Sequence, residues 1–107
     1  MKLIIAIINH DDAKAVTQAL TKNGFSSTKL ATTGGFLMAG NATILVGVDE
    51  DKVCEAIAVI KERSRSRRQL IPTTTEMISG YYPSAPVEVT VGGATIFVVD
   101  IERFERV

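Results

Sequence analysis

The segment that most constrains this chain is an unbroken apolar run near its start, residues 3–8, in which four of the six residues are isoleucine. Such a run is typical of a strand that is buried on both faces of a sheet. It is too short to span a bilayer, and polar residues 9–12 follow it at once. We therefore expect a buried strand here, and neither a membrane span nor a targeting segment.

Helix and strand patterns alternate over the next part of the chain. Asp11 or Asp12 is a candidate N-cap for a helix with apolar residues at helical spacing, and Gly24 suits the position just after its end. Residues 25–31 and 42–48 then predict two strands, separated by a Gly-Gly break.

A second helix is predicted to begin in the acidic residues 49–51, with an apolar stripe that includes Val53 and Ile60. Cys54 lies beside this stripe, which favours a buried structural thiol over a nucleophile. The helix is expected to end in the basic residues 61–68. Because no aromatic residue interleaves with these arginines, a solvated helix end is favoured over an RNA contact.

Residues 69–86 show no helix or strand periodicity, and strand patterns resume at residues 87–91 and 94–99. We expect Gly92 and Gly93 to turn these two strands into a hairpin, and the tail, residues 100–107, to pack on the fold. The order β-α-β-β-α-β with an added hairpin strand predicts an α+β, ferredoxin-like fold in a single domain, residues 1–107.

Small and hydroxylated residues surround Phe36 in the stretch 28–47, which is broken by Gly34 and Gly35. Backbone N–H groups in a glycine bend can receive an anion, and an aromatic ring can stack on a base. Together they suggest a nucleotide site. A plain hairpin turn explains the same glycines and is the favoured reading of this stretch by itself.

Composition narrows the possible partners. Twelve basic and twelve acidic residues balance, so no net field recruits nucleic acid or a membrane surface. The single cysteine excludes an internal disulfide and favours a reducing cytoplasm. Apolar residues make up 46% of the 107 residues, a high share for a small monomer, which hints at a buried subunit interface.

The residue inventory argues against an enzyme. His10 is the only histidine, and no second cysteine or histidine exists to complete a zinc site. Acidic residues cluster at predicted helix starts, where capping explains them. We expect no catalytic residues, no metal and no cofactor.

Two motifs, TKLATTGGFLMAGN at residues 28–41 and PVEVTVGGATIFVV at 86–99, make the chain similar to the PII-like cyclic di-AMP receptors of Gram-positive bacteria. The resemblance covers essentially the whole chain. It implies a non-enzymatic, cytoplasmic signal receptor whose ferredoxin-like subunits form a homotrimer, with cyclic di-AMP in each cleft between subunits. It also implies a short loop at residues 32–40, a long loop at 64–85, and a downstream protein that the sequence does not identify.

The resemblance also implies ligand contacts at individual positions. Phe36 matches the aromatic residue that packs on an adenine. The full set of matching positions is Thr28, Gly35, Phe36, Leu37, Asn41, Gly47 and Phe97.

Three further positions depart from the family pattern. Gly24 replaces an asparagine, Ser26 replaces a frequent basic residue, and Arg106 stands where some members have glutamine. The first two departures imply lost ligand contacts, and Arg106 implies a charge that compensates for them.

Two other readings stay open. One is a related trimer that senses another adenine nucleotide, such as ATP or ADP, although the short loop counts against it. The other is a divalent-cation-tolerance-type trimer, against which the lack of a histidine–cysteine cluster counts.

Overall fold

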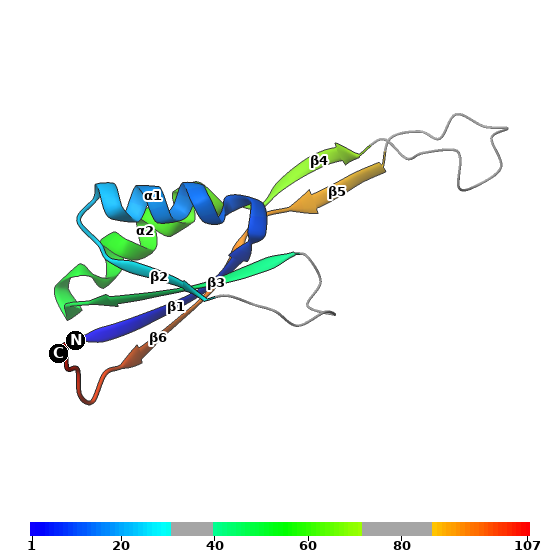
Figure 1. The fold of residues 1–107 in the computed structure, drawn as a ribbon. Helices are drawn as coiled ribbons and strands as arrows, with labels where there is room; N and C mark the ends of the chain where they lie inside the picture. The colour runs from blue at the N-terminus through cyan, green and yellow to red at the C-terminus, as the bar shows by residue number, and fades with distance from the viewer. Residues whose placement is uncertain (31–39, 72–86) are drawn as a thin grey trace, which may run out of the picture.

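A four-stranded antiparallel sheet forms the body of the molecule in the computed structural model, which describes residues 1–30, 40–71 and 87–107 (Figure 1). The strand order is β2-β3-β1-β6, so that the first strand lies inside the sheet. The strands are β1 (Lys2–Asn9), β2 (Ser27–Leu30), β3 (Asn41–Val48) and β6 (Ala94–Asp100).

Both helices cover the same face of this sheet (Figure 1). A short 3₁₀ turn precedes each of them: η1 (His10–Asp12) leads into α1 (Ala13–Lys22), and η2 (Glu50–Lys52) leads into α2 (Val53–Ser64). The Asn9 side chain accepts a hydrogen bond from the backbone N–H of Asp11 and so caps the first turn. Asp12 occupies the N-cap position of α1 without a side-chain capping bond, so the predicted capping role belongs to Asn9 instead.

The core lies between the helices and one face of the sheet. Ile4, Ala6 and Ile8 of β1 are fully buried there, while the intervening residues of β1 are only half-buried. Residues alternate between the two faces of a strand, so this pattern marks one covered face and one open face. The prediction that β1 is buried on both faces does not hold within a single chain.

The second face of the sheet is apolar although no helix covers it. In the β1–β6 register Ile5 lies opposite Phe97 and Leu3 lies opposite Val99. Phe97 is 51% exposed and Val99 is 43% exposed. We call this surface, with Leu3, Ile5, Phe97 and Val99, the open face.

A separate two-stranded ribbon extends from one end of the body (Figure 1). It consists of β4 (Arg67–Ile71) and β5 (Val87–Val91), which pair antiparallel. The predicted hairpin of residues 87–91 with 94–99 is therefore wrong, because β5 pairs with β4 and β6 pairs with β1. Strand β4 also replaces the end of the helix that was expected to continue toward residue 68.

Gly92 and Gly93 carry the chain from the ribbon to the main sheet. Both have positive φ, 82° and 88°, a conformation that glycine adopts without a steric penalty. The Gly93 N–H donates to the Ser64 carbonyl at the end of α2, which ties this junction to the helix. The two glycines therefore redirect the chain instead of closing a tight hairpin.

Cys54 is exposed, so the prediction of a buried thiol is wrong. The fully buried residues of α2 are Ala56, Ile60 and Ser64, which recur every fourth position. Cys54 precedes Ala56 by two residues, which places it on the opposite side of the helix.

Candidate functional site

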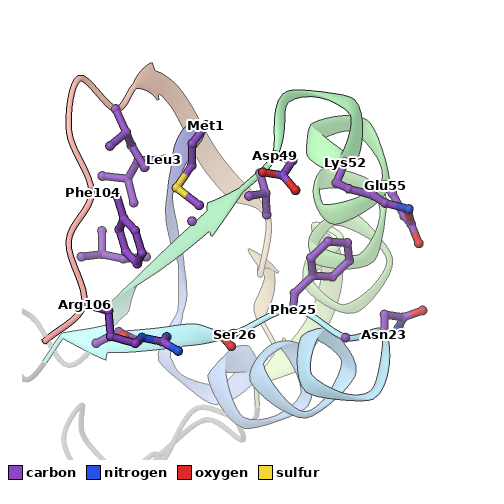
Figure 2. A pocket seen from close by; sticks show the side chains of 16 residues that line it. Met1, Leu3, Asn23, Phe25, Ser26, Asp49, Lys52, Glu55, Phe104 and Arg106 are labelled. Carbon is purple, nitrogen blue, oxygen red and sulfur yellow. The ribbon is translucent and has the colours of Figure 1, made fainter.

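A cavity of about 740 Å³ opens at the end of the sheet where β1 begins and the C-terminal tail passes (Figure 2). Five segments supply its walls: the start of β1, the connection between α1 and β2 with the first part of β2, the end of β3, the start of α2, and residues 101–107. They come from the start, the middle and the end of the sequence, so the cavity exists only in the folded chain.

The connection between α1 and β2 is shaped by the end of the helix. Asn23 is the C-cap of α1, and Gly24 follows with a φ of +86°. The Phe25 N–H then donates to the Leu20 carbonyl at 2.8 Å, which closes the helix end. The prediction that Gly24 follows the helix end is confirmed. This turn brings Phe25 and Ser26 to the cavity wall.

The strands contribute a wall that has open space at one position, Gly47. Thr28 of β2 lies opposite Leu45 of β3, and Gly47 of β3 lies opposite Leu3 of β1. All four residues line the cavity. A Cβ atom built at Gly47 would meet no atom within 4 Å, so the glycine leaves open space on this side.

The start of α2 brings charge to the opposite wall. Lys52 Nζ lies 3.5 Å from Glu55 Oε2, and Asp49 also lines the cavity. Arg106 of the tail is the other cation of the lining. Within the described part of the chain, Lys52 has a carboxylate partner and Arg106 has none.

The tail is held at its start by one backbone hydrogen bond, from the Ile101 N–H to the Met1 carbonyl at 3.1 Å. It then runs along the cavity, and Ile101, Phe104 and Arg106 line it (Figure 2). Ile101 is half-buried, whereas Phe104 is 59% exposed. The prediction that the tail packs on the fold holds only for Ile101, because residues 102–107 are exposed, and Phe104 leaves an aromatic ring at the cavity.

Five of the residues that the sequence singled out meet in this cavity: Gly24, Ser26, Thr28, Gly47 and Arg106. Two others lie elsewhere. Asn41 is paired with Asn9 where β3 begins, and Phe97 lies on the open face. Gly35, Phe36 and Leu37 fall outside the described residues. The ligand contacts assigned to all these positions stay predictions.

Sequence reasoning missed Phe25, Lys52 and Phe104, which also line the cavity. Phe25 packs against the core, and the sequence shows it only as the start of a predicted strand. Lys52 follows the acidic run at a helix start. Phe104 stands among charged residues of the tail, where no periodic pattern indicates which way its ring points.

Comparison with known protein families gives one match over the full chain. A family model described as "Cyclic-di-AMP receptor" matches residues 1–107. The chain belongs to the cyclic-di-AMP receptor family. Membership in a receptor family favours a binding protein over an enzyme, and it makes cyclic di-AMP the ligand class to test first.

A solved structure supports the same fold for this cyclic-di-AMP receptor family member. A functionally unknown protein from Pediococcus pentosaceus ATCC 25745 is 37% identical and superposes with a TM-score of 0.75. The match covers 99% of this chain and 96% of that one. Both are therefore small mixed α/β folds with an antiparallel sheet and two helices.

Metal binding finds no support in the described residues. Across residues 1–30, 40–71 and 87–107, no three histidine, cysteine, aspartate or glutamate side chains group as a metal site would require. In the same ranges no helix is long and apolar enough to cross a bilayer.

Proposed function

We propose that this chain is a non-enzymatic signal receptor that binds cyclic di-AMP in clefts between the subunits of a homotrimer. The observation that carries the proposal is the convergence on one cavity of five positions that the family resemblance assigned to the ligand, in a chain matched over its full length by the receptor family. Four of these positions lie in the first half of the chain and one lies in the C-terminal tail.

The subunit in this proposal is ferredoxin-like and of the PII-like type. The strand order β2-β3-β1-β6, with two helices on one face, supports this description. The β4–β5 ribbon is then the addition that distinguishes this subunit.

The trimer would cover the open face. Leu3, Ile5, Phe97 and Val99 present apolar surface there that the chain itself does not bury. Contiguous exposed apolar surface of this kind marks an interface in soluble proteins. Phe97, which does not line the cavity of its own chain, would then reach the cleft shared with a neighbour.

The cavity offers the chemistry that a cyclic dinucleotide requires. Lys52 and Arg106 supply positive charge for two phosphates, and Arg106 can do so without giving up a carboxylate partner among the described residues. Gly47 lets a ligand approach the strand backbone closely. Binding would alter the loop at residues 32–40 and the segment 64–85, of which residues 67–71 are strand β4 and not loop, for a downstream protein in the cytoplasm.

A thermal-shift panel tests this function against its alternatives. A ligand that binds only the native state at a hundred times its Kd adds about 2.7 kcal/mol to stability, which raises the Tm clearly. Cyclic di-AMP should raise the Tm, while cyclic di-GMP, AMP and copper should not. A shift with ATP or ADP alone would support the adenine-nucleotide sensor, and a shift with copper alone would support the cation-tolerance-type trimer.

A further inference from the structure

We propose that Phe104 is a base-stacking residue of the ligand site, with its ring against a purine base of the bound nucleotide. This inference rests on the proposed function and adds a specificity-determining contact from the C-terminal tail. It starts from an exposed aromatic ring that the fold does not explain. Phe104 is 59% exposed and lies outside the cluster of core residues and those packed on it.

The register of the tail determines which side chains face the cavity. Arg103 Nη2 lies 2.9 Å from Glu105 Oε1, so these two side chains pair with each other. The alternate residues, Phe104 and Arg106, line the cavity instead. Alternation of this kind is the property of an extended segment. In this register Arg103 and Glu105 pair with each other, and Phe104 is presented to the cavity.

The position of the tail is set at its start. The hydrogen bond from the Ile101 N–H to the Met1 carbonyl joins it to the beginning of β1. Figure 2 shows Phe104 and Phe25 approaching the cavity from different walls, the first from the tail and the second from the connection before β2. An aromatic ring on a wall that also carries Arg106 offers a flat apolar face next to a cation, which suits a base and its phosphate.

An apolar ligand without a phosphate fits this cavity less well. Lys52, Glu55, Asp49 and Arg106 line the same cavity as Phe104. Burying these charges against a lipid chain would be unfavourable, whereas a nucleotide presents a polar backbone to them. The ligand class that matches both features is a nucleotide, and the proposed function makes its base a purine.

The test is calorimetric titration of the full-length chain with cyclic di-AMP. The substitutions at Phe104 distinguish the effect of its aromatic ring from the effect of its side-chain volume. Phe104→Leu and Phe104→Ala remove the stacking face and should weaken binding roughly 5- to 150-fold. Phe104→Tyr keeps the face and should stay close to the wild-type affinity. Val107→Ala alters a neighbouring tail residue that does not line the cavity, and it serves as the matched control.

The outcomes separate this inference from the proposed function. If the wild-type chain does not bind cyclic di-AMP, the proposed function fails. If it binds and Phe104→Ala binds equally well, the stacking role is overturned while the receptor function stands. Light scattering and the Tm of each unliganded variant complete the test. A Phe104→Ala variant that loses its oligomeric state would make Phe104 a subunit contact and would also overturn the inference.

Discussion

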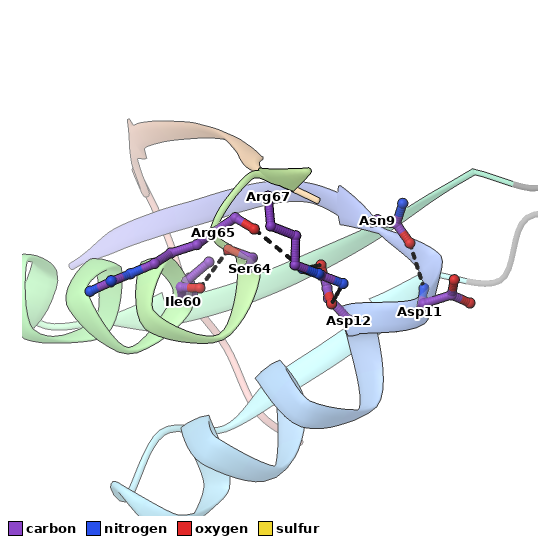
Figure 3. A network of polar contacts seen from close by, with 7 residues as sticks. All are labelled: Asn9, Asp11, Asp12, Ile60, Ser64, Arg65 and Arg67. Atoms are coloured by element: carbon purple, nitrogen blue, oxygen red, sulfur yellow. Dashed lines mark hydrogen bonds and ion pairs between the residues drawn. The ribbon is translucent and has the colours of Figure 1, made fainter. Parts of the chain in front are cut away.

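Arg67 and Asp12 form a two-pronged ion pair between the base of the β4–β5 ribbon and the start of α1 (Figure 3). Arg67 Nη2 lies 3.0 Å from Asp12 Oδ1, and Nη1 lies 3.3 Å from Oδ2. The Asp12 side chain is only 9% exposed. The hydrogen bond to Asp12 raises the pKa of Arg67 above its usual value, so this cation keeps its charge at every physiological pH.

We expect Asp12→Asn to lower the Tm by on the order of 5 °C, because it leaves the Arg67 guanidinium without its charged partner. Because the pKa of Arg67 is raised, the guanidinium stays charged at these pH values, so the deficit should be the same from pH 6 to pH 9. The control is Asp11→Asn, since Asp11 is exposed and makes no ion pair among the described residues. An equal loss in both variants would contradict this account.

The Lys2–Asp100 pair joins the ends of β1 and β6 and predicts a pH dependence. The hydrogen bond from Lys2 lowers the pKa of Asp100 below 3.8, and the same bond raises the pKa of Lys2 above 10.5. The stability from Asp100 is therefore fully present above pH 3.8 and is lost as the pH falls through the depressed pKa. The stability from Lys2 is present below pH 10.5 and is lost as the pH rises through the raised pKa.

Thermal unfolding of Asp100→Asn should accordingly show a lower Tm than the wild type between pH 5 and pH 9. The difference should shrink as the pH falls below 3.8. A Tm difference that stays constant down to pH 2 would show that the lost contact does not depend on the carboxylate charge.

Gly92 is the position in this junction where a side chain is least tolerated. Its φ is +82°, and a Cβ atom would lie 2.6 Å from the Arg65 carbonyl oxygen and 2.7 Å from Arg67 Nη1. Gly24 has a similar φ, +86°, but a Cβ atom there would meet nothing within 4 Å.

Gly24→Ala should therefore cost only the conformational penalty of about 1–2 kcal/mol. Gly92→Ala should cost more, because the steric overlap adds to that penalty and displaces the Arg67 side chain. Urea unfolding of both variants measures the difference. Equal losses would mean that the ribbon relaxes around the added methyl group.

The arrangement of the main sheet could be predicted from the sequence, because its strands and helices carry strong periodic patterns. The partner of β5 could not, since Gly92 and Gly93 suit a hairpin and a redirected chain equally well. The choice depends on Arg67 and Ser64, which are distant in sequence and meet these glycines only in the folded chain. Cys54 was misplaced for a related reason, because a residue beside an apolar stripe can fall on either side of it.

The candidate site could be predicted only in part. Gly24, Ser26, Thr28, Gly47 and Arg106 meet in the cavity, as one site requires. They were chosen by resemblance to a family and not by any pattern in the chain. Phe104 and Lys52 were not predicted to line the cavity, because its walls form only when distant segments meet in the folded chain. Short-range sequence patterns carry no information on such contacts.

Subunit association should depend on the open face. We expect the wild-type chain to be a trimer at micromolar concentration and Val99→Asp to shift it toward monomer, because the new charge would be buried against a neighbour. Leu70→Asp is the control, since Leu70 is 65% exposed on the β4–β5 ribbon and away from the main sheet. Multi-angle light scattering distinguishes trimer from monomer. A wild-type chain that is monomeric would contradict the proposal that the ligand binds between subunits.

Calorimetric titration of the wild-type protein tests most directly whether this chain binds cyclic di-AMP. We expect saturable binding with one cyclic di-AMP per chain, and binding of cyclic di-GMP and AMP that is weaker by tenfold or more, about 1.4 kcal/mol. No heat of binding and no Tm shift with cyclic di-AMP, or tighter binding of ATP, would contradict it.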